Sequence, residues 1–167
     1  MHNFFRVRVV GVCLLAIALG FPLTVFGETL VGKVVKVADG DTVTVLDGNQ
    51  VQHRVRLTGI DAPESRQAFG KRSREALAAL VAGRQVEVEW HKRDRYQRLV
   101  GKVIVDGTDA NLAQLRAGLA WWYRQYAREQ TPADRAIYAA AEAKAQADQR
   151  GLWVDRDPVP PWDWRKQ

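Results

Sequence analysis

The sequence predicts an α+β fold that is mainly β, namely a small five-stranded barrel of the OB type with three helices. Two observations support this fold class. Runs of alternating or β-branched residues form five short segments separated by turn signals. Helical periodicity appears only after the third and after the fifth of these segments, which is an order that suits a small closed barrel. The length of 167 residues and the apolar content of 47% fit a single domain with its own core.

The first three strands are predicted between Leu30 and Ile60. Valines are frequent at the start of this stretch, residues 42–46 form a β-branched run, and residues 51–57 alternate apolar and polar side chains. The tripeptide Asp47-Gly48-Asn49 is a strong signal for a tight turn. Pro63 ends the three-stranded meander, because proline cannot donate a hydrogen bond to a sheet.

The helices and the last two strands follow in order. A helix is predicted over Ala68–Val81, where Leu77, Leu80 and Val81 share one face, with Gly83 as its stop. Strands are predicted over residues 86–90 and 99–105, joined by a charged loop over residues 91–98.

Two further helices complete the predicted fold. The first is short, is capped by Thr108 or Asp109 and stops at Gly118. The second begins at the cap Thr131, runs to Asp148 and has Gly151 as its stop. Its expected packing face is thin, so we expect this helix to rest on the barrel. That face consists of Ile137, Ala140, Ala141 and Lys144.

The predicted organisation has three parts. Residues 1–27 read as a signal peptide, since Arg6 and Arg8 precede an apolar stretch over Val9–Phe21 and the small Gly27 comes before an acidic residue. An uncleaved membrane anchor is the alternative, because the apolar run approaches spanning length. Residues 28–154 form the domain. Residues 155–167, rich in proline and tryptophan, are expected to lie extended over its body.

Cysteine, histidine and charge narrow the function classes. The only cysteine is Cys13, inside the presumed signal, so residues 28–167 can form neither a disulfide framework nor a thiolate metal site. Lipid attachment at Cys13 is a weaker alternative, because the residues before it match a lipoprotein signal poorly. The three histidines are far apart, which gives no support to histidine-based zinc or triad chemistry. The formal charge of +6 favours a polyanionic partner without identifying one.

Acids and arginines at strand ends are the candidate chemical groups. Asp41 and Asp61 each follow a predicted strand, and together they could offer a hard all-oxygen site for calcium or magnesium. Arg56 and Arg98 could offer forked donors to a phosphate. Acids also collect at turns, and most arginines of a basic protein are solvated. The spacing alone leaves both interpretations open.

Several motifs in order resemble the staphylococcal nuclease (thermonuclease) family, over roughly Leu30 to Trp153. A set of mixed motifs in the right order is far more specific than any one of them. The motifs are Val37-Ala38-Asp39-Gly40-Asp41-Thr42, Arg56-Leu57-Thr58-Gly59-Ile60-Asp61-Ala62-Pro63-Glu64, Asp94-Arg95-Tyr96-Gln97-Arg98, Ala117-Gly118-Leu119-Ala120 and Arg150-Gly151-Leu152-Trp153.

The resemblance implies the OB-type barrel with three helices and a calcium-dependent phosphodiesterase acting on DNA and/or RNA, leaving 5′-hydroxyl and 3′-phosphate ends. Asp41 and Asp61 match the calcium-binding aspartates, and Ala62 matches a position that offers its backbone carbonyl to the metal. The three catalytic positions of the family are matched by Arg56, Glu64 and Arg98.

Two departures from the family pattern fall near the expected substrate site. Gln97 stands where the founding sequence has glycine, directly before the catalytic arginine. Of the aromatic pair that stacks on nucleotide in the family, Tyr126 matches one position, while Arg124 occupies the other. We therefore take Arg95 and Tyr126 as the candidates for substrate binding.

Three hypotheses follow. The first is an exported nuclease, periplasmic or secreted, that needs calcium, takes nucleic acid as substrate and is a monomer by default; it meets the membrane only if its N-terminal segment is not cleaved. The second is a non-catalytic OB-type module that only binds nucleic acid. The third is a metal-stabilised structural or inhibitory protein of the envelope, which would bind no DNA even at low salt.

Overall fold

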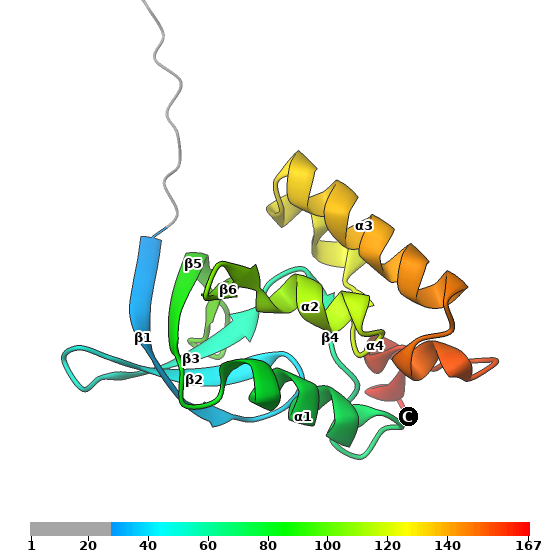
Figure 1. The fold of residues 1–167 in the computed structure, drawn as a ribbon, viewed down its shortest axis with the longest axis horizontal. Helices are drawn as coiled ribbons and strands as arrows, with labels where there is room; N and C mark the ends of the chain where they lie inside the picture. The colour runs from blue at the N-terminus through cyan, green and yellow to red at the C-terminus, as the bar shows by residue number, and fades with distance from the viewer. Residues whose placement is uncertain (1–27) are drawn as a thin grey trace, which may run out of the picture.

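The computed structural model describes residues 28–167, and the predicted signal peptide lies outside them. The principal sheet has the strand order β3-β2-β1-β5-β6, and β3 pairs in parallel with β6 to close it into a barrel. The two-residue strand β7 extends one edge along β6. This confirms the predicted five-stranded OB-type barrel (Figure 1). The strands are β1 (Glu28–Val37), β2 (Thr42–Asp47), β3 (Gln52–Leu57), β5 (Gln85–Arg93), β6 (Leu99–Val105) and β7 (Thr108–Asp109).

Strand β1 is bent by a bulge and pairs with a strand on each side. β1 pairs antiparallel with both β2 and β5, and its register with β2 shifts between Val34 and Lys36. Such a bulge bends the strand and increases its twist, as closing a small barrel requires. Gly32 lies where the strands cross most closely, since a Cβ there would come within 2.4 Å of the carbonyl oxygen of Leu46.

The core consists of the inward-facing side chains of the barrel together with one face of each packed helix. Burying each such apolar side chain stabilises the fold by about 1.5–3 kcal/mol. The fully buried strand residues are mostly β-branched, which suits a pleated surface. Core side chains include Val34, Val43, Val45, Val55, Leu57, Val88, Leu99, Val103, Leu77, Leu115 and Tyr138.

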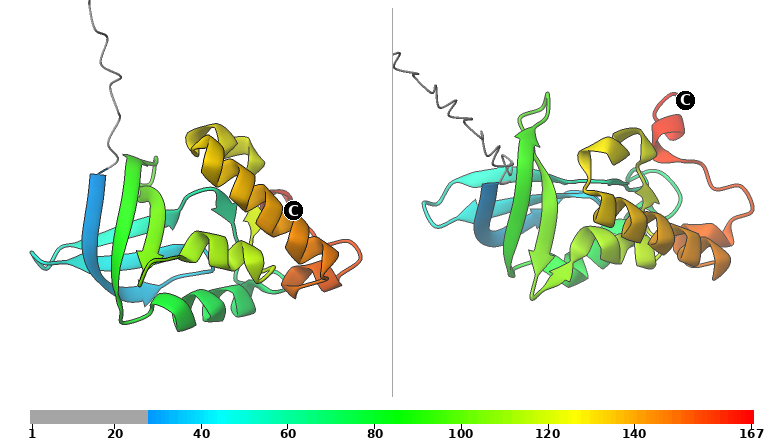
Figure 2. Two further views of the ribbon diagram at one scale, coloured as in Figure 1. Left: turned by 45° about the horizontal axis from the view of Figure 1, so that its top comes forward. Right: turned by 90° about the horizontal axis from the view of Figure 1, so that it is seen from above.

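Three helices accompany the barrel: the first two lie against it, and the third packs on the second rather than directly on the barrel as predicted (Figures 1 and 2). They are α1 (Gly70–Val81), α2 (Ala110–Arg116) and α3 (Pro132–Ala147). The predicted caps are confirmed where a side chain makes them. Asp109 accepts a hydrogen bond from the Leu112 N–H, and Thr131 accepts one from the Asp134 N–H.

The packing face predicted for α3 was wrong by about one residue. Its buried residues are Tyr138, Ala141, Glu142 and Ala145, whereas Ile137 is 47% exposed. The polar tips explain the rotation of the helix. The Tyr138 hydroxyl donates to Asp109, and the Glu142 carboxylate accepts from the Trp122 N–H at 2.9 Å. The prediction counted Tyr138 and Glu142 as polar and therefore placed this face of the helix in solvent.

Other boundaries also differ from the prediction. β5 continues through Arg93, so the charged loop shrinks to a turn at residues 94–97. A small second sheet, absent from the prediction, pairs β4 (Ile60–Asp61) with β8 (Trp121–Trp122). Residues 155–160 carry no regular structure, but α4 (Pro161–Trp164) adds one short helical turn to the tail. Within residues 28–167, no helix has both the length and the apolar character needed to cross a membrane.

Candidate active site

One surface cleft collects every site residue that the sequence analysis proposed. It opens between the end of the β1–β2 hairpin, the β3–β4 turn and the loop between β5 and β6. Its lining includes Asp41, Arg56, Asp61, Ala62, Glu64, Arg95, Arg98 and Tyr126. The sequence spacing alone could not establish this convergence.

Two buried aspartates lie at the bottom of the cleft. Asp41 is 5% exposed and Asp61 only 1%. The Asp41 carboxylate accepts a hydrogen bond from the Ala62 N–H at 2.6 Å, which ties the turn after β1 to the end of β4. Asp39 supports the same turn by accepting from the Asp41 N–H at 3.0 Å. These bonds bring together two carboxylates that are twenty residues apart in the chain.

Gly40 lets the helices approach this turn closely. A Cβ at Gly40 would lie 1.8 Å from the Ser73 hydroxyl oxygen. The Gln114 side chain donates to the Gly40 carbonyl at 2.7 Å and to the Ser73 carbonyl at 3.0 Å. α1 and α2 therefore clamp the turn that carries Asp41. A side chain at this position would force them apart.

Arg56 links the two carboxylates. One of its terminal nitrogens lies 3.2 Å from Oδ2 of Asp41 and 2.8 Å from Oδ1 of Asp61. Its other terminal nitrogen donates to two main-chain carbonyls, those of Leu57 and Ile60. We call Asp41, Arg56 and Asp61 the floor of the cleft. Every member of the floor is fixed by contacts with more than one element.

Arg56 alone does not offset the two carboxylates of the floor, and Arg165 from the tail brings a second positive charge 2.7 Å from Asp61. Burial raises the pKa of Asp41 to about 7, and the nearby Asp39 and Asp61 add to the rise while Arg56 opposes it. Two buried acids that repel one another favour a cation between them. Calcium binds six to eight oxygens, so two carboxylates, a backbone carbonyl, water and a substrate phosphate form a chemically suitable donor set. Among the described residues there is no group of three or more histidine, cysteine, aspartate or glutamate side chains placed to hold a metal.

Arg98 lines the same cleft from the end of a tight turn, directly before β6. The Asp94 carboxylate accepts from the Arg98 Nε at 2.7 Å and also from the Arg98 N–H at 3.0 Å. Gln97 has a φ of 60°, in the left-handed region that favours glycine. This conformation explains why glycine suits the position in the founding sequence, and here Gln97 adopts it despite its side chain. We call residues 94–98 the rim loop.

The rim loop carries exposed aromatic and basic groups. Tyr96 is 58% exposed, and the guanidinium carbons of Arg95 and Arg98 lie 4.8 Å and 5.3 Å from its ring centre. Tyr126, the other substrate-binding candidate, is 40% exposed and has the Lys92 ammonium 5.5 Å from its ring centre. Arg95 and Tyr126 thus both line the cleft, and each lies close to another aromatic or basic side chain.

Glu64 is the most accessible carboxylate of the predicted set. Its side chain is 40% exposed, and its backbone is held by Gln67, whose side chain accepts from the Glu64 N–H at 3.1 Å. One carboxylate oxygen lies 2.7 Å from Arg165. An exposed carboxylate beside buried ones is well suited to contact a water molecule.

Two residues of the cleft that contact its candidate site residues were not predicted from the sequence. Tyr123 meets Tyr126 edge-to-face at 4.8 Å, with its N–H bonded to the Gly59 carbonyl, but the sequence showed only a cluster of aromatic residues. Arg165 reaches the cleft from the tail, where no periodicity indicated a contact. Arg124 instead pairs with the buried Glu142 and lies over the Trp122 ring.

An OB-type barrel whose cleft combines buried carboxylates, arginines and exposed aromatic rings defines a class of protein that acts on phosphodiesters. Known proteins agree with this class. The family model described as "Staphylococcal nuclease homologue" matches residues 54–155. The chain belongs to the staphylococcal nuclease family, and it is a nuclease, a hydrolase whose substrate is nucleic acid.

Similar proteins come from several bacteria. A protein of Escherichia coli O157:H7 described as an "Uncharacterized endonuclease" is 44% identical over 135 residues, covering 80% of this chain and 84% of the relative. One of the same description from Haemophilus influenzae is 41% identical, covering 81% and 72%. A "Micrococcal nuclease" from Shigella flexneri is 40% identical over 144 residues, covering 81% and 80%.

Proposed function

We propose that this nuclease hydrolyses DNA and/or RNA with calcium as its metal, bound by Asp41, Asp61 and the backbone carbonyl of Ala62. The observation that carries the proposal is the pair of buried aspartates that line one cleft and share contact with Arg56. When bound, calcium would neutralise the substrate phosphate and orient it for attack. The remaining ligands would come from water and from the phosphate itself.

The catalytic roles that we propose follow from charge and access. Glu64 holds the attacking water and takes its proton, because its exposed carboxylate lines the cleft and shares the Arg165 guanidinium with Asp61. Arg56, on β3, and Arg98, directly before the neighbouring β6, stabilise the additional negative charge of the five-coordinate phosphorus. The new P–O bond forms to the water oxygen while the bond to the 5′ oxygen breaks. The 5′ oxygen takes up a proton from solvent and Glu64 releases its proton to solvent, leaving 5′-hydroxyl and 3′-phosphate ends.

The bases of the substrate would contact the aromatic side of the cleft. Tyr126 offers an exposed ring face, and Arg95 offers charge to a neighbouring phosphate. Stacking on an aromatic ring accepts every base, so this arrangement fits a nuclease with little sequence preference.

Cleavage of single-stranded DNA in excess calcium, compared with cleavage in a calcium chelator, tests the proposal. Glu64→Gln keeps the shape of the side chain and removes its basicity. We expect calcium-dependent shortening of the DNA that falls at least about a hundredfold in this variant. Glu75→Gln, at an exposed position of α1, is the matched control and should cleave normally. End-labelling of the products identifies the 5′-hydroxyl and 3′-phosphate.

Equal cleavage with and without calcium would contradict the metal assignment. DNA that is bound but stays intact under every condition would support the non-catalytic binding module instead. Full activity of Glu64→Gln would remove Glu64 from the mechanism while leaving the nuclease itself in place.

We also propose that the protein acts after export, on the pattern of residues 1–27. N-terminal sequencing of the protein recovered from periplasm, medium and membrane would test this. A mature N-terminus close to Glu28 in a soluble fraction is the expected result. An intact N-terminus in the membrane fraction would support the uncleaved anchor.

A further inference from the structure

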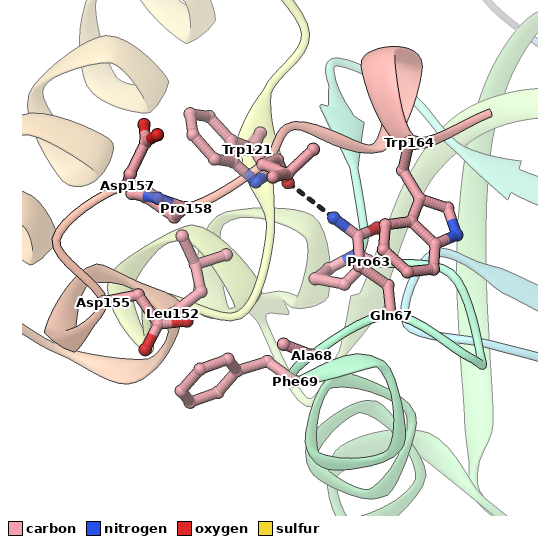
Figure 3. A pocket seen from close by; sticks show the side chains of 11 residues that line it. Pro63, Gln67, Ala68, Phe69, Trp121, Leu152, Asp155, Asp157, Pro158 and Trp164 are labelled. Carbon is pink, nitrogen blue, oxygen red and sulfur yellow. Dashed lines mark hydrogen bonds between the residues drawn. The ribbon is translucent and has the colours of Figure 1, made fainter. Parts of the chain in front are cut away.

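The C-terminal tail is anchored beside the cleft by several independent contacts. The Trp162 ring stacks on Tyr123, with ring centres 5.4 Å apart and planes 2° from parallel, and meets Trp121 edge-on at 5.7 Å. Gln67 donates a side-chain hydrogen bond to the Val159 carbonyl, and Pro161 is buried. Figure 3 shows Trp164 beside Gln67 and Pro63 in the pocket beneath this segment. The tail is therefore packed on residues that adjoin Glu64 and the floor.

Arg165 follows directly from this anchor and reaches the floor. One terminal nitrogen lies 2.7 Å from Oδ2 of Asp61, and the other lies 2.7 Å from Oε1 of Glu64 and 3.3 Å from Oδ1 of Asp61. Both oxygens of Asp61 thus contact the tail. These two acids stand 104 and 101 residues before Arg165 in the chain.

The contact places a positive charge on the groups that the proposed mechanism needs free. Asp61 is the buried carboxylate assigned to calcium, and Glu64 is assigned to the attacking water. A guanidinium in contact with both Asp61 oxygens and a divalent cation on the same carboxylate would repel one another strongly at this depth. Occupancy of Asp61 by one cation therefore disfavours the other.

We propose that the tail carries an internal competitor for the metal: Arg165 occupies Asp61 and Glu64 when calcium is absent, and calcium must displace it to bind. This inference rests on the proposed assignment of calcium to Asp61. The anchor formed by Trp162 holds the guanidinium close to its site, so that its effective concentration there is high. The free enzyme is thereby kept in a closed form that calcium opens.

Calcium affinity measured by titration calorimetry, on the protein without nucleic acid, tests the inference independently of cleavage. Arg165→Gln removes the competing charge and should tighten calcium binding about tenfold, if about nine molecules in ten are closed. Trp162→Ala keeps the charge but loosens the anchor, and should tighten binding in the same direction. Lys166→Gln is the matched control, since Lys166 is the next residue, carries the same charge and, among residues 28–167, pairs only with Asp163, at 2.7 Å. Its calcium affinity should equal that of the wild type.

Hydrogen exchange of the tail gives a second measurement. Calcium should increase amide exchange over residues 162–167 in the wild type, and Arg165→Gln should show faster exchange even without calcium. An unchanged or weaker calcium affinity in Arg165→Gln would overturn the inference while leaving the metal site itself intact. Tighter binding in Lys166→Gln would overturn it too, because net charge would then explain the effect. An absence of calcium binding in every variant would overturn both the inference and the metal assignment.

Discussion

The floor and the rim loop both present an arginine beside a carboxylate, but they hold it in different ways. Arg56 is 15% exposed and joins two aspartates from different turns, together with two main-chain carbonyls. Arg98 is 21% exposed and pairs with Asp94, four residues earlier in the same turn. The floor is thus built by the tertiary fold, and the rim loop largely by its own sequence. The arginine of the floor should therefore contribute strongly to the free energy of unfolding, and the arginine of the rim loop very little.

Arg56→Gln should have the largest effect of the substitutions that test this difference. Removing one partner of a buried charge network leaves two buried carboxylates under-compensated, which costs about 3–5 kcal/mol of unfolding free energy. Denaturant unfolding in the presence of a chelator measures this loss, and cleavage should be lost as well. Arg54→Gln, on the exposed side of the same strand, should change neither quantity appreciably. A stability loss below about 1 kcal/mol would show that the floor does not depend on Arg56.

Arg98→Gln should separate activity from stability. The unfolding free energy should change by less than about 1 kcal/mol, because the pair with Asp94 is local and near the surface. The cleavage rate should nevertheless fall about 10²–10³-fold, the usual cost of losing one preorganised donor to the transition state. Rates at saturating DNA and calcium, measured beside thermal unfolding, test both halves. Arg98→Lys, which keeps the charge without the fork, should recover only part of the rate.

The smallest expected effect is a pH dependence at the rim loop. Burial pushes the pKa of Asp94 upward, but hydrogen bonds from the Arg98 backbone and side chain outweigh it and hold that pKa below its usual value. The interaction is therefore fully present above the unfolded pKa of about 3.9, and is lost as the pH falls through the lower folded value. Asp94→Asn should be less stable than the wild type at pH 7 by under about 1 kcal/mol.

That difference should shrink toward zero as the pH falls through the lowered folded-state pKa, below which Asp94 is protonated in both states. Urea unfolding of wild type and variant across this range measures it. A gap that stays constant down to the lowest pH would mean that the carboxylate charge is not what stabilises the turn.

The same contrast shows what the sequence could and could not predict. The rim loop and the helix caps are local, so a run of a few residues contains the physical cause of their structure, as with Asp94 and Asp109. The positions of the five barrel strands along the chain could also be predicted from periodicity. The convergence of Asp41 and Asp61 was not, because it depends on a hydrogen bond from the Ala62 N–H to Asp41, 21 residues earlier in the chain.

The missed features share one cause. The α3 face, Tyr123 and Arg165 are all set by partners distant in the sequence, such as Asp109 for Tyr138 and Asp61 for Arg165. The tail is the extreme case, since its position follows from aromatic stacking and an ion pair rather than from secondary-structure propensity. A resemblance that ended near Trp153 could give no information about Arg165.

The parallel pairing of β3 with β6 also makes activity depend on a long-range contact formed during folding. Val55 lies beside Leu99 in that pairing, and Arg56 and Arg98 flank it. Hairpins between neighbouring strands form early and cheaply, whereas joining distant strands must overcome a large loop-closure entropy. A chain that has formed only its hairpins keeps the two arginines apart on separate pieces. The arrangement that the proposed catalysis needs therefore depends on this long-range pairing, so a chain that has formed only its hairpins should not cleave nucleic acid.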